Sequence, residues 1–195
     1  LVMLGTYIID AGDSVAYPER FVFKPGRKSY IGYLNEHVSA ARKSGAVVGV
    51  SVVCIDLQDD IDFLTASEEA GADYLSLCLH STMPMFLNAG LSSALLRREN
   101  WPKLRTRVEP ILKAVTRPFI AKIGTGTTPD AIEAAGELTD AGVPIIHAHV
   151  PKAAAPESRD AIRKLRKRCR NLIVSGGIKT AEDALQGARD IVAEW

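Results

Sequence analysis

The chain has few cysteines, and their positions exclude the frameworks that cysteines usually build. Cys54, Cys78 and Cys169 are odd in number, and no two of them form a CxxC pair. Such a set argues against a disulfide framework or a zinc knuckle and is typical of a reducing compartment. We therefore expect three free thiols in a cytoplasmic protein.

An excess of charge and a long apolar run are also missing. The 24 Lys and Arg residues nearly balance the 23 Asp and Glu residues, so the net charge of +1 favours neither nucleic acid nor membrane. No apolar segment approaches the roughly 18 residues of a membrane-spanning helix, and no signal peptide is recognisable. We expect a soluble protein without membrane contact. Because the sequence starts at Leu1 and not at Met, we also expect that an N-terminal piece is missing.

Apolar residues, by contrast, are plentiful and regularly placed. They make up 47% of the 195 residues, enough for a large core, and we expect a single domain over residues 1–195. Their distribution predicts six near-continuous apolar strands, over residues 2–9, 46–55, 74–79, 118–123, 144–149 and 172–174. Uninterrupted apolar strands are typical of a parallel sheet that is covered on both faces.

A helix is predicted after each strand, and turn or capping residues set its ends. The predicted helices cover about residues 29–44, 60–70, 91–96, 103–115, 128–141, 156–169 and 180–192. Asp60 and Thr128 are the expected N-caps of two of them, and Thr180 with Asp183 forms a capping box at the last. Residues 11–27, which contain two prolines and two glycines, are predicted to cross the surface.

Two α/β architectures fit this alternation, a (β/α)8 barrel and an open doubly wound sheet. Polar and Gly-rich residues follow nearly every strand, whereas an open sheet concentrates them at one switch point. We therefore predict a TIM (β/α)8 barrel. A complete barrel has eight strands in about 250 residues, so six strands imply that strands 1 and 8 are lacking in this chain. The two open sheet edges would then need a second copy or a partner subunit to cover them.

The stretch from Ala72 to Leu96 is the first candidate site. Its apolar strand runs into a loop that carries His80, Ser81 and Thr82. In α/β enzymes such loops after strands carry catalytic residues, although an ordinary connection between strand and helix fits the same pattern. Cys78, inside the strand, fits a small core residue.

Further candidate site residues stand at the ends of three other predicted strands. Lys122 ends a predicted strand, where an unpaired ammonium is costly to bury and no carboxylate partner is identifiable. Gly176 and Gly177 precede a predicted helix and would present backbone N–H groups to an anion. His147 and His149 share one strand face, but an HxH pair without a third ligand is a weak signal, and we predict no metal site.

Four parts of the chain resemble a known family in order and spacing. They are GADYLSLCLHS (71–81) with NAGLSSALLRRENWPKL (88–104), VTRPFIAKIGTG (115–126), AGVPIIHAH (141–149) and LIVSGGIKTAEDAL (172–185). Together they resemble the FMN-dependent (β/α)8 family of tRNA-dihydrouridine synthases and dihydroorotate dehydrogenases, and most closely its archaeal dihydrouridine-synthase-like branch. The likeness covers residues 46–192. It implies a flavoprotein oxidoreductase that reduces or forms a C=C bond in a small molecule or in a tRNA nucleobase.

The resemblance also implies roles for particular residues. Lys122 stands where the family places a lysine over the pyrimidine edge of FMN, and His149 stands at the histidine after the sixth strand. Ser175, Gly176 and Gly177 match the turn that helps to hold the FMN phosphate. The family likeness thus makes these five residues candidate cofactor ligands, and makes Lys122 and His149 candidate catalytic residues as well.

Three positions depart from the family pattern. Ser51 stands where a flavin-contacting glutamine is usual and Cys78 where an asparagine is usual, so the resemblance places both beside the cofactor. Ser81 occupies the position of the synthases' catalytic cysteine, which protonates the substrate carbon opposite the hydride. A serine hydroxyl is a far weaker acid and would need a relay. Ser81 is the third candidate catalytic residue.

Other functions fit the same residues. A barrel lyase or isomerase of a phosphorylated metabolite would keep the phosphate turn and use Lys122 as a Schiff-base or electrostatic residue. A degenerate barrel would instead be a non-catalytic subunit. The basic residues of segments 97–107 and 159–170 fit either solvated helix faces, which we favour, or a surface for tRNA or a partner protein.

Overall fold

A single parallel sheet forms the centre of the molecule. The structure is a computed structural model that describes residues 1–12, 17–151, 156–178, 180–182 and 184–185. Its seven strands lie in the order β2-β1-β3-β4-β5-β6-β7, and every pair is parallel. The strands are β1 (Val2–Ile9), β2 (Val22–Phe23), β3 (Val48–Cys54), β4 (Tyr74–Leu79), β5 (Phe119–Gly124), β6 (Ile145–His149) and β7 (Leu172–Ser175).

Helices connect the strands. The α-helices of the described residues are α1 (Ile31–Lys43), α2 (Leu57–Glu69), α3 (Pro84–Asn88), α4 (Trp101–Ala114), α5 (Ala131–Asp140) and α6 (Pro156–Arg166). Short 3-10 helices are η1 (Glu19–Phe21), η2 (Arg27–Ser29), η3 (Ser92–Leu96) and η4 (Arg98–Asn100). None of the described helices is long and apolar enough to span a bilayer.

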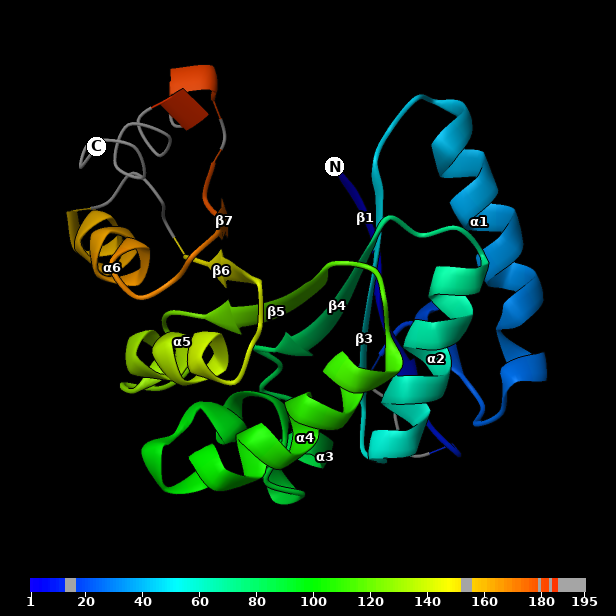
Figure 1. Cartoon of the computed structure of the whole chain (residues 1–195), viewed down its shortest axis with the longest axis horizontal. Helices are drawn as coiled ribbons and strands as arrows, with labels where there is room; N and C mark the ends of the chain where they lie inside the picture. The colour runs from blue at the N-terminus through cyan, green and yellow to red at the C-terminus, as the bar shows by residue number, and fades with distance from the viewer. Residues whose placement is uncertain (13–16, 152–155, 179, 183, 186–195) are drawn as a thin grey trace.

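The main helices cover one face of the sheet. From β3 to β7 the strand order advances in one direction, whereas β2 lies on the other side of β1, as in the 2-1-3-4-5 order of a doubly wound sheet. Crossovers between parallel strands have one hand, so this progression puts the connecting helices on the same side. Accordingly, α2 packs on β3 and β4, α5 on β5 and β6, and α6 on β7. Figure 1 shows α1, α2, α4, α5 and α6 following one another around this outer side.

The two faces of the sheet differ in chemistry. Leu77 and Leu79 of β4 face the helices and are at most 2% exposed. Because side chains alternate along a strand, Cys78 faces the other, inner side. There it lies in register with Lys122 of β5, which in turn pairs with His147 of β6. Cys78 is buried, as predicted, but it also lines a pocket on the inner face.

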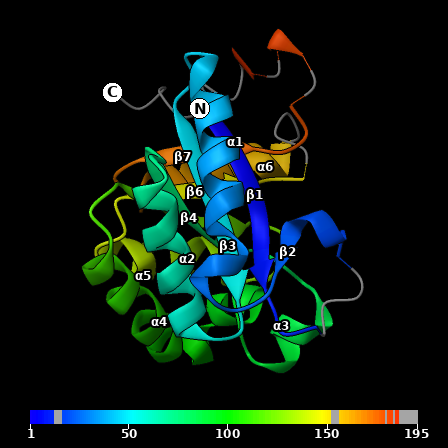
Figure 2. The same ribbon diagram turned by 90° about the vertical axis from the view of Figure 1, so that its right-hand side faces the viewer.

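The predicted strands are all present, with ends within two residues of the prediction. The count was one short, because β2 was missed. Its two residues pair with Ile8 and Ile9 at the end of β1 and belong to residues 20–23, which the sequence suggests to be extended but which were not counted as a strand. Figure 2 shows β2 beside β1 at this edge of the sheet.

Several predicted helix ends are wrong. Asp56 caps α2 by accepting a hydrogen bond from the Gln58 N–H at 2.7 Å, whereas Asp60, the predicted cap, lies inside the helix. The helix α5 begins three residues after Thr128, the cap predicted for it. Both errors have the same cause. Several capping residues stand close together at these helix starts, and backbone geometry selects among them.

Two further predictions concern the loop after β4 and the end of the chain. Residues 84–88 form α3, which was not predicted, and the predicted helix over 91–96 is the 3-10 helix η3. The predicted helix over 180–192, with Asp183 of its capping box, lies largely outside the described residues.

A buried ion pair joins α2 and α4 under the end of β3. Asp60 is fully buried and Arg107 is 8% exposed, and their side chains form a direct salt bridge. The Arg107 guanidinium also donates to the carbonyls of Cys54 at 2.6 Å and Ile55 at 2.9 Å. Arg107 therefore belongs to the core, and its assignment to a basic surface for solvent or RNA is wrong.

We predict that Arg107→Met lowers the free energy of unfolding by about 3–5 kcal/mol, because it leaves the Asp60 carboxylate buried without its cation. Urea denaturation monitored by circular dichroism measures this change. Arg105→Met on the same helix is the matched control. Its ion pair with Glu137 is partly exposed, so the loss there should stay within about 1 kcal/mol. Equal losses in the two variants would contradict the assignment.

Candidate functional site

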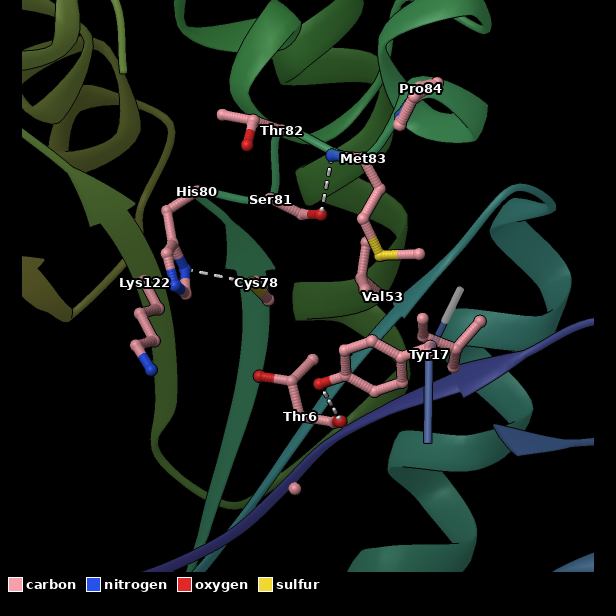
Figure 3. A pocket seen from close by; sticks show the side chains of 12 residues that line it. Thr6, Tyr17, Val53, Cys78, His80, Ser81, Thr82, Met83, Pro84 and Lys122 are labelled. Carbon is pink, nitrogen blue, oxygen red and sulfur yellow. Dashed lines mark hydrogen bonds between the residues drawn. The ribbon is translucent and has the colours of Figure 1, made fainter. Parts of the chain in front are cut away.

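A pocket of about 550 Å³ opens on the inner face, at the carboxyl ends of the strands. Segments far apart in the sequence form its walls, namely the ends of β1, β3, β4 and β5 and the loop after β4 (Figure 3). It is lined by Gly5, Thr6, Ile8, Tyr17, Val53, Cys78, His80, Ser81, Thr82, Met83, Pro84 and Lys122. None of these lining residues is acidic. A small or medium-sized ligand fits a cavity of this volume.

Cys78, His80 and Lys122 form the polar wall of the pocket. Cys78 Sγ lies 3.0 Å from His80 Nδ1, within hydrogen-bond distance. Lys122 is the strand neighbour of Cys78 on β5. Figure 3 shows the three side chains on one side of the pocket, with Thr6, whose hydroxyl contacts the thiol, and Tyr17 beside Cys78. The Lys122 ammonium makes no ion pair or hydrogen bond with any residue in the described part of the chain.

Two serines of η3 hold the loop that carries His80 and Ser81. Ser92 Oγ donates to the Cys78 carbonyl at 3.1 Å and accepts from the Ser81 N–H at 2.9 Å. Ser93 Oγ donates to the Ser81 carbonyl at 2.8 Å. Ser81 itself lines the pocket, and its hydroxyl accepts the Met83 N–H at 3.3 Å. The predicted catalytic serine is thus at the site, with its oxygen engaged to the backbone.

Two histidines of β6 extend the polar face beyond the pocket. His147 is 8% exposed, and its Nε2 lies 2.7 Å from Ser175 Oγ on β7. Its Nδ1 is buried without a partner among the described protein atoms. The ring of His149 lies 5.6 Å from the ring of His80, centroid to centroid. Gly124 permits this approach, since a Cβ there would come within 3.1 Å of the His80 Cβ.

The glycine turn after β7 lies at the same end of the sheet as Lys122. Gly176 has a φ of 99°, and a Cβ on it would meet the Val150 carbonyl at 2.1 Å. Glycine is therefore required for the turn to pack against the end of β6. Two strand spacings of about 4.8 Å separate β5 from β7, and Gly176 lies three residues beyond Ile173, the residue in register with Lys122, so Lys122 and this turn are roughly 14 Å apart.

Burial and charge set the protonation of the site. Burial, followed by the nearby Lys122 ammonium, lowers the pKa of His80 to about 4 and that of His147 to about 4. Burial raises the pKa of the Cys78 thiol, against the opposing effect of Lys122. At pH 7 the thiol and these two imidazoles are therefore neutral, and Lys122 supplies the positive charge of this wall.

Ser51, a candidate cofactor contact, lies outside the pocket lining. Ser51 is fully buried on β3, and its Oγ lies 3.1 Å from Thr6 Oγ1. Within the ranges that the structure describes, no three His, Cys, Asp or Glu side chains converge as a metal site. Sequence reasoning missed Thr6 and Tyr17, which line the pocket beside Cys78. No local pattern marks them, because the pairing of β1 with β3 places Thr6, and Tyr17 reaches the pocket from the segment after β1, where its hydroxyl donates to the Thr6 carbonyl.

We predict that protonation of the buried imidazoles destabilises the fold in acid. The folded pKa values, about 4, lie below the ordinary 6.5, so the unfolded chain binds more protons between these pH values. The stability that the neutral imidazoles contribute is present above pH 6.5 and is lost as the pH falls towards 4. The free energy of unfolding of His147→Asn should therefore fall less between pH 7.5 and 5 than that of the wild type. His37→Asn, on α1, is the control, and an unchanged pH profile in His147→Asn would refute the prediction.

Comparison with known proteins does not assign the chain to a family. No family model matches it. The chain is similar to an uncharacterized protein of Methanocaldococcus jannaschii, with 27% identity over 137 residues that cover 66% of this chain and 50% of the relative. The chain thus spans about half the length of the curated relative it matches.

Proposed function

We propose that the chain forms part of a TIM (β/α)8 barrel, and that this barrel binds FMN as an oxidoreductase similar to dihydrouridine synthases and dihydroorotate dehydrogenases. The helix layer supports the barrel, because α1, α2, α4, α5 and α6 each pack on the next along one side of the sheet, as the outer helices of a barrel do. Within the described residues, β2 and β7 each pair on one side only, and the proposal includes a second copy or a partner subunit that covers these edges.

One observation carries the flavin proposal. Lys122 lines a pocket that has no acidic wall residue, and its ammonium has no counter-ion among the described residues. A positive charge in a half-enclosed site is stabilised by an anion. Reduced flavin is anionic at its pyrimidine edge and carries a phosphate at the other end, so it supplies negative charge at two separated points.

The residues present fit such a cofactor. Lys122 would face the pyrimidine edge, and the turn of Ser175, Gly176 and Gly177 would hold the phosphate from the same end of the sheet. His147 Nδ1 is buried and has no hydrogen-bond partner among the described residues, so a polar group of the cofactor would satisfy it. His149, between Lys122 and this turn in strand order, would stand near the ring system. Bound FMN supplies hydride transfer to or from a C=C bond.

The other side of the pocket would hold the substrate. Tyr17, Thr82 and Met83 line this side, and Ser81 would contact the substrate through its hydroxyl. The pocket admits a small molecule or a single nucleobase, so a tRNA substrate would have to present one base turned out of its stack. Ser51 lies under the pocket, where its bond to Thr6 supports the wall.

We predict that the purified protein binds FMN, with a shift in the visible absorption spectrum, and that Lys122→Met weakens this binding about 10- to 100-fold. The loss corresponds to one charge-assisted interaction of about 1.5–3 kcal/mol. Titration of flavin fluorescence measures both affinities. Lys113→Met, at an exposed position of α4, is the matched control and should bind FMN like the wild type.

Riboflavin and phosphorylated metabolites without a flavin test the phosphate site and flavin binding separately. Riboflavin, which lacks the phosphate, should bind more weakly than FMN if the glycine turn holds that group. Absence of any FMN binding, or an equal loss in Lys122→Met and Lys113→Met, would refute the proposal. If phosphorylated metabolites without a flavin raised the melting temperature while FMN did not, the lyase or isomerase alternative would replace it.

A further inference from the structure

The flavin proposal places Cys78 beside the cofactor but gives the thiol–imidazole pair in the pocket wall no chemical role. Cys78 and His80 are two residues apart at the end of β4, and both side chains line the cavity with Sγ and Nδ1 3.0 Å apart. We propose that Cys78 is a nucleophile, that His80 accepts its proton, and that Lys122 holds the anionic group of a small electrophilic substrate beside it. This inference does not depend on FMN binding.

The strand pairing keeps the three groups in place. Cys78 and Lys122 are register partners on β4 and β5, so their Cα atoms lie about one strand spacing apart, near 4.8 Å. His80 follows β4 directly, and Ser92 fixes the backbone on both sides of it through the Cys78 carbonyl and the Ser81 N–H. A nucleophile with a base within hydrogen-bond distance is the arrangement that covalent catalysis uses, and Lys122 on the neighbouring strand adds a cation to it.

A small molecule reaches the Cys78 sulfur through the pocket. Cys78 is only 3% exposed, yet it forms part of the wall of a 550 Å³ cavity. The other two cysteines lie elsewhere, with Cys54 fully buried next to Asp60 and Cys169 behind α6 at 4% exposure. All three are free thiols of similar burial. A difference in their reactivity would therefore report on the pocket and its neighbouring groups.

The charges of the site select the class of substrate. No acidic residue lines the pocket, and at pH 7 His80 is neutral, so the net charge of the lining comes from Lys122. An electrophile that carries a carboxylate or phosphate is attracted to this ammonium, while a cationic one is repelled. The proposed substrate is therefore an anionic electrophile, of which an α,β-unsaturated carboxylate is one example.

The proposed step is the addition of the thiol across an activated double bond. The S–H proton passes to His80 Nδ1 while sulfur attacks the β-carbon, so that a C–S bond forms and the C=C π bond breaks. The α-carbon then takes the proton from His80, which returns to its neutral form. The sum is addition of S and H to the double bond, and it needs no oxidant or reductant.

Alkylation by iodoacetate, an anionic electrophile, and by its neutral analogue iodoacetamide tests this proposal at pH 7.5. Mass spectrometry of peptides follows each cysteine separately. In the native protein, we expect iodoacetate to modify Cys78 at least tenfold faster than Cys54 or Cys169. Lys122→Met should slow modification of Cys78 by iodoacetate about tenfold and by iodoacetamide at most twofold. His80→Asn should slow both reagents.

Three controls keep the outcome specific. In urea the three cysteines should react at equal rates, which shows that the native difference comes from the fold. Lys113→Met should leave both rates at Cys78 unchanged, and thermal melts should show that Lys122→Met and His80→Asn remain folded. Equal native rates for the three cysteines, or an unchanged ratio of the two reagents in Lys122→Met, would overturn the proposal.

Discussion

The parallel pairing of β4, β5 and β6 is the constraint on which the site depends. Its register aligns Cys78, Lys122 and His147 in one row across the inner face of the sheet. A slip of one residue on β5 would turn Lys122 towards the helices and place Ala121 or Ile123 in the row. The apolar outer face resists such a slip, because Ile123 and Ala121 are fully buried there. Packing on one face thus fixes the chemistry on the other.

The layer of helices contributes in the same way from behind the sheet. Arg107 on α4 reaches over α2 to the last carbonyls of β3 and pairs there with Asp60. Its hydrogen bonds fix the end of β3, where Val53 enters the pocket wall. On the neighbouring strand, Ser92 of η3 holds the exit of β4. Buried polar groups therefore hold two of the strand ends that carry the site.

The apolar runs predicted the six longer strands because a fully covered strand is apolar at nearly every position. They could not predict β2, whose two residues are held by pairing with the end of β1. The apolar runs also do not predict which face of β4 carries the pocket. Cys78 has a leucine before and after it, so both faces of the strand are apolar, and only the positions of the helices distinguish them. Asp60 and Arg107 are 47 residues apart, and each alone resembles a cap or a surface charge. Their contact arises only in the folded chain.

The two buried imidazoles and the Lys122 ammonium lower the stability of the fold where they stand. Buried imidazoles remain neutral here, with the pKa values of His80 and His147 near 4, and an ammonium stands beside them without a carboxylate among the lining residues. Apolar residues in the same row would pack at lower cost, because an unpaired charge near a buried surface is poorly solvated. A bound anion would reverse this balance. It would neutralise Lys122 and so weaken the repulsion that, after burial, lowers the pKa of both imidazoles, which would favour a proton on His80 during a reaction. The arrangement that makes these groups costly to bury is therefore the one that an anionic ligand would stabilise.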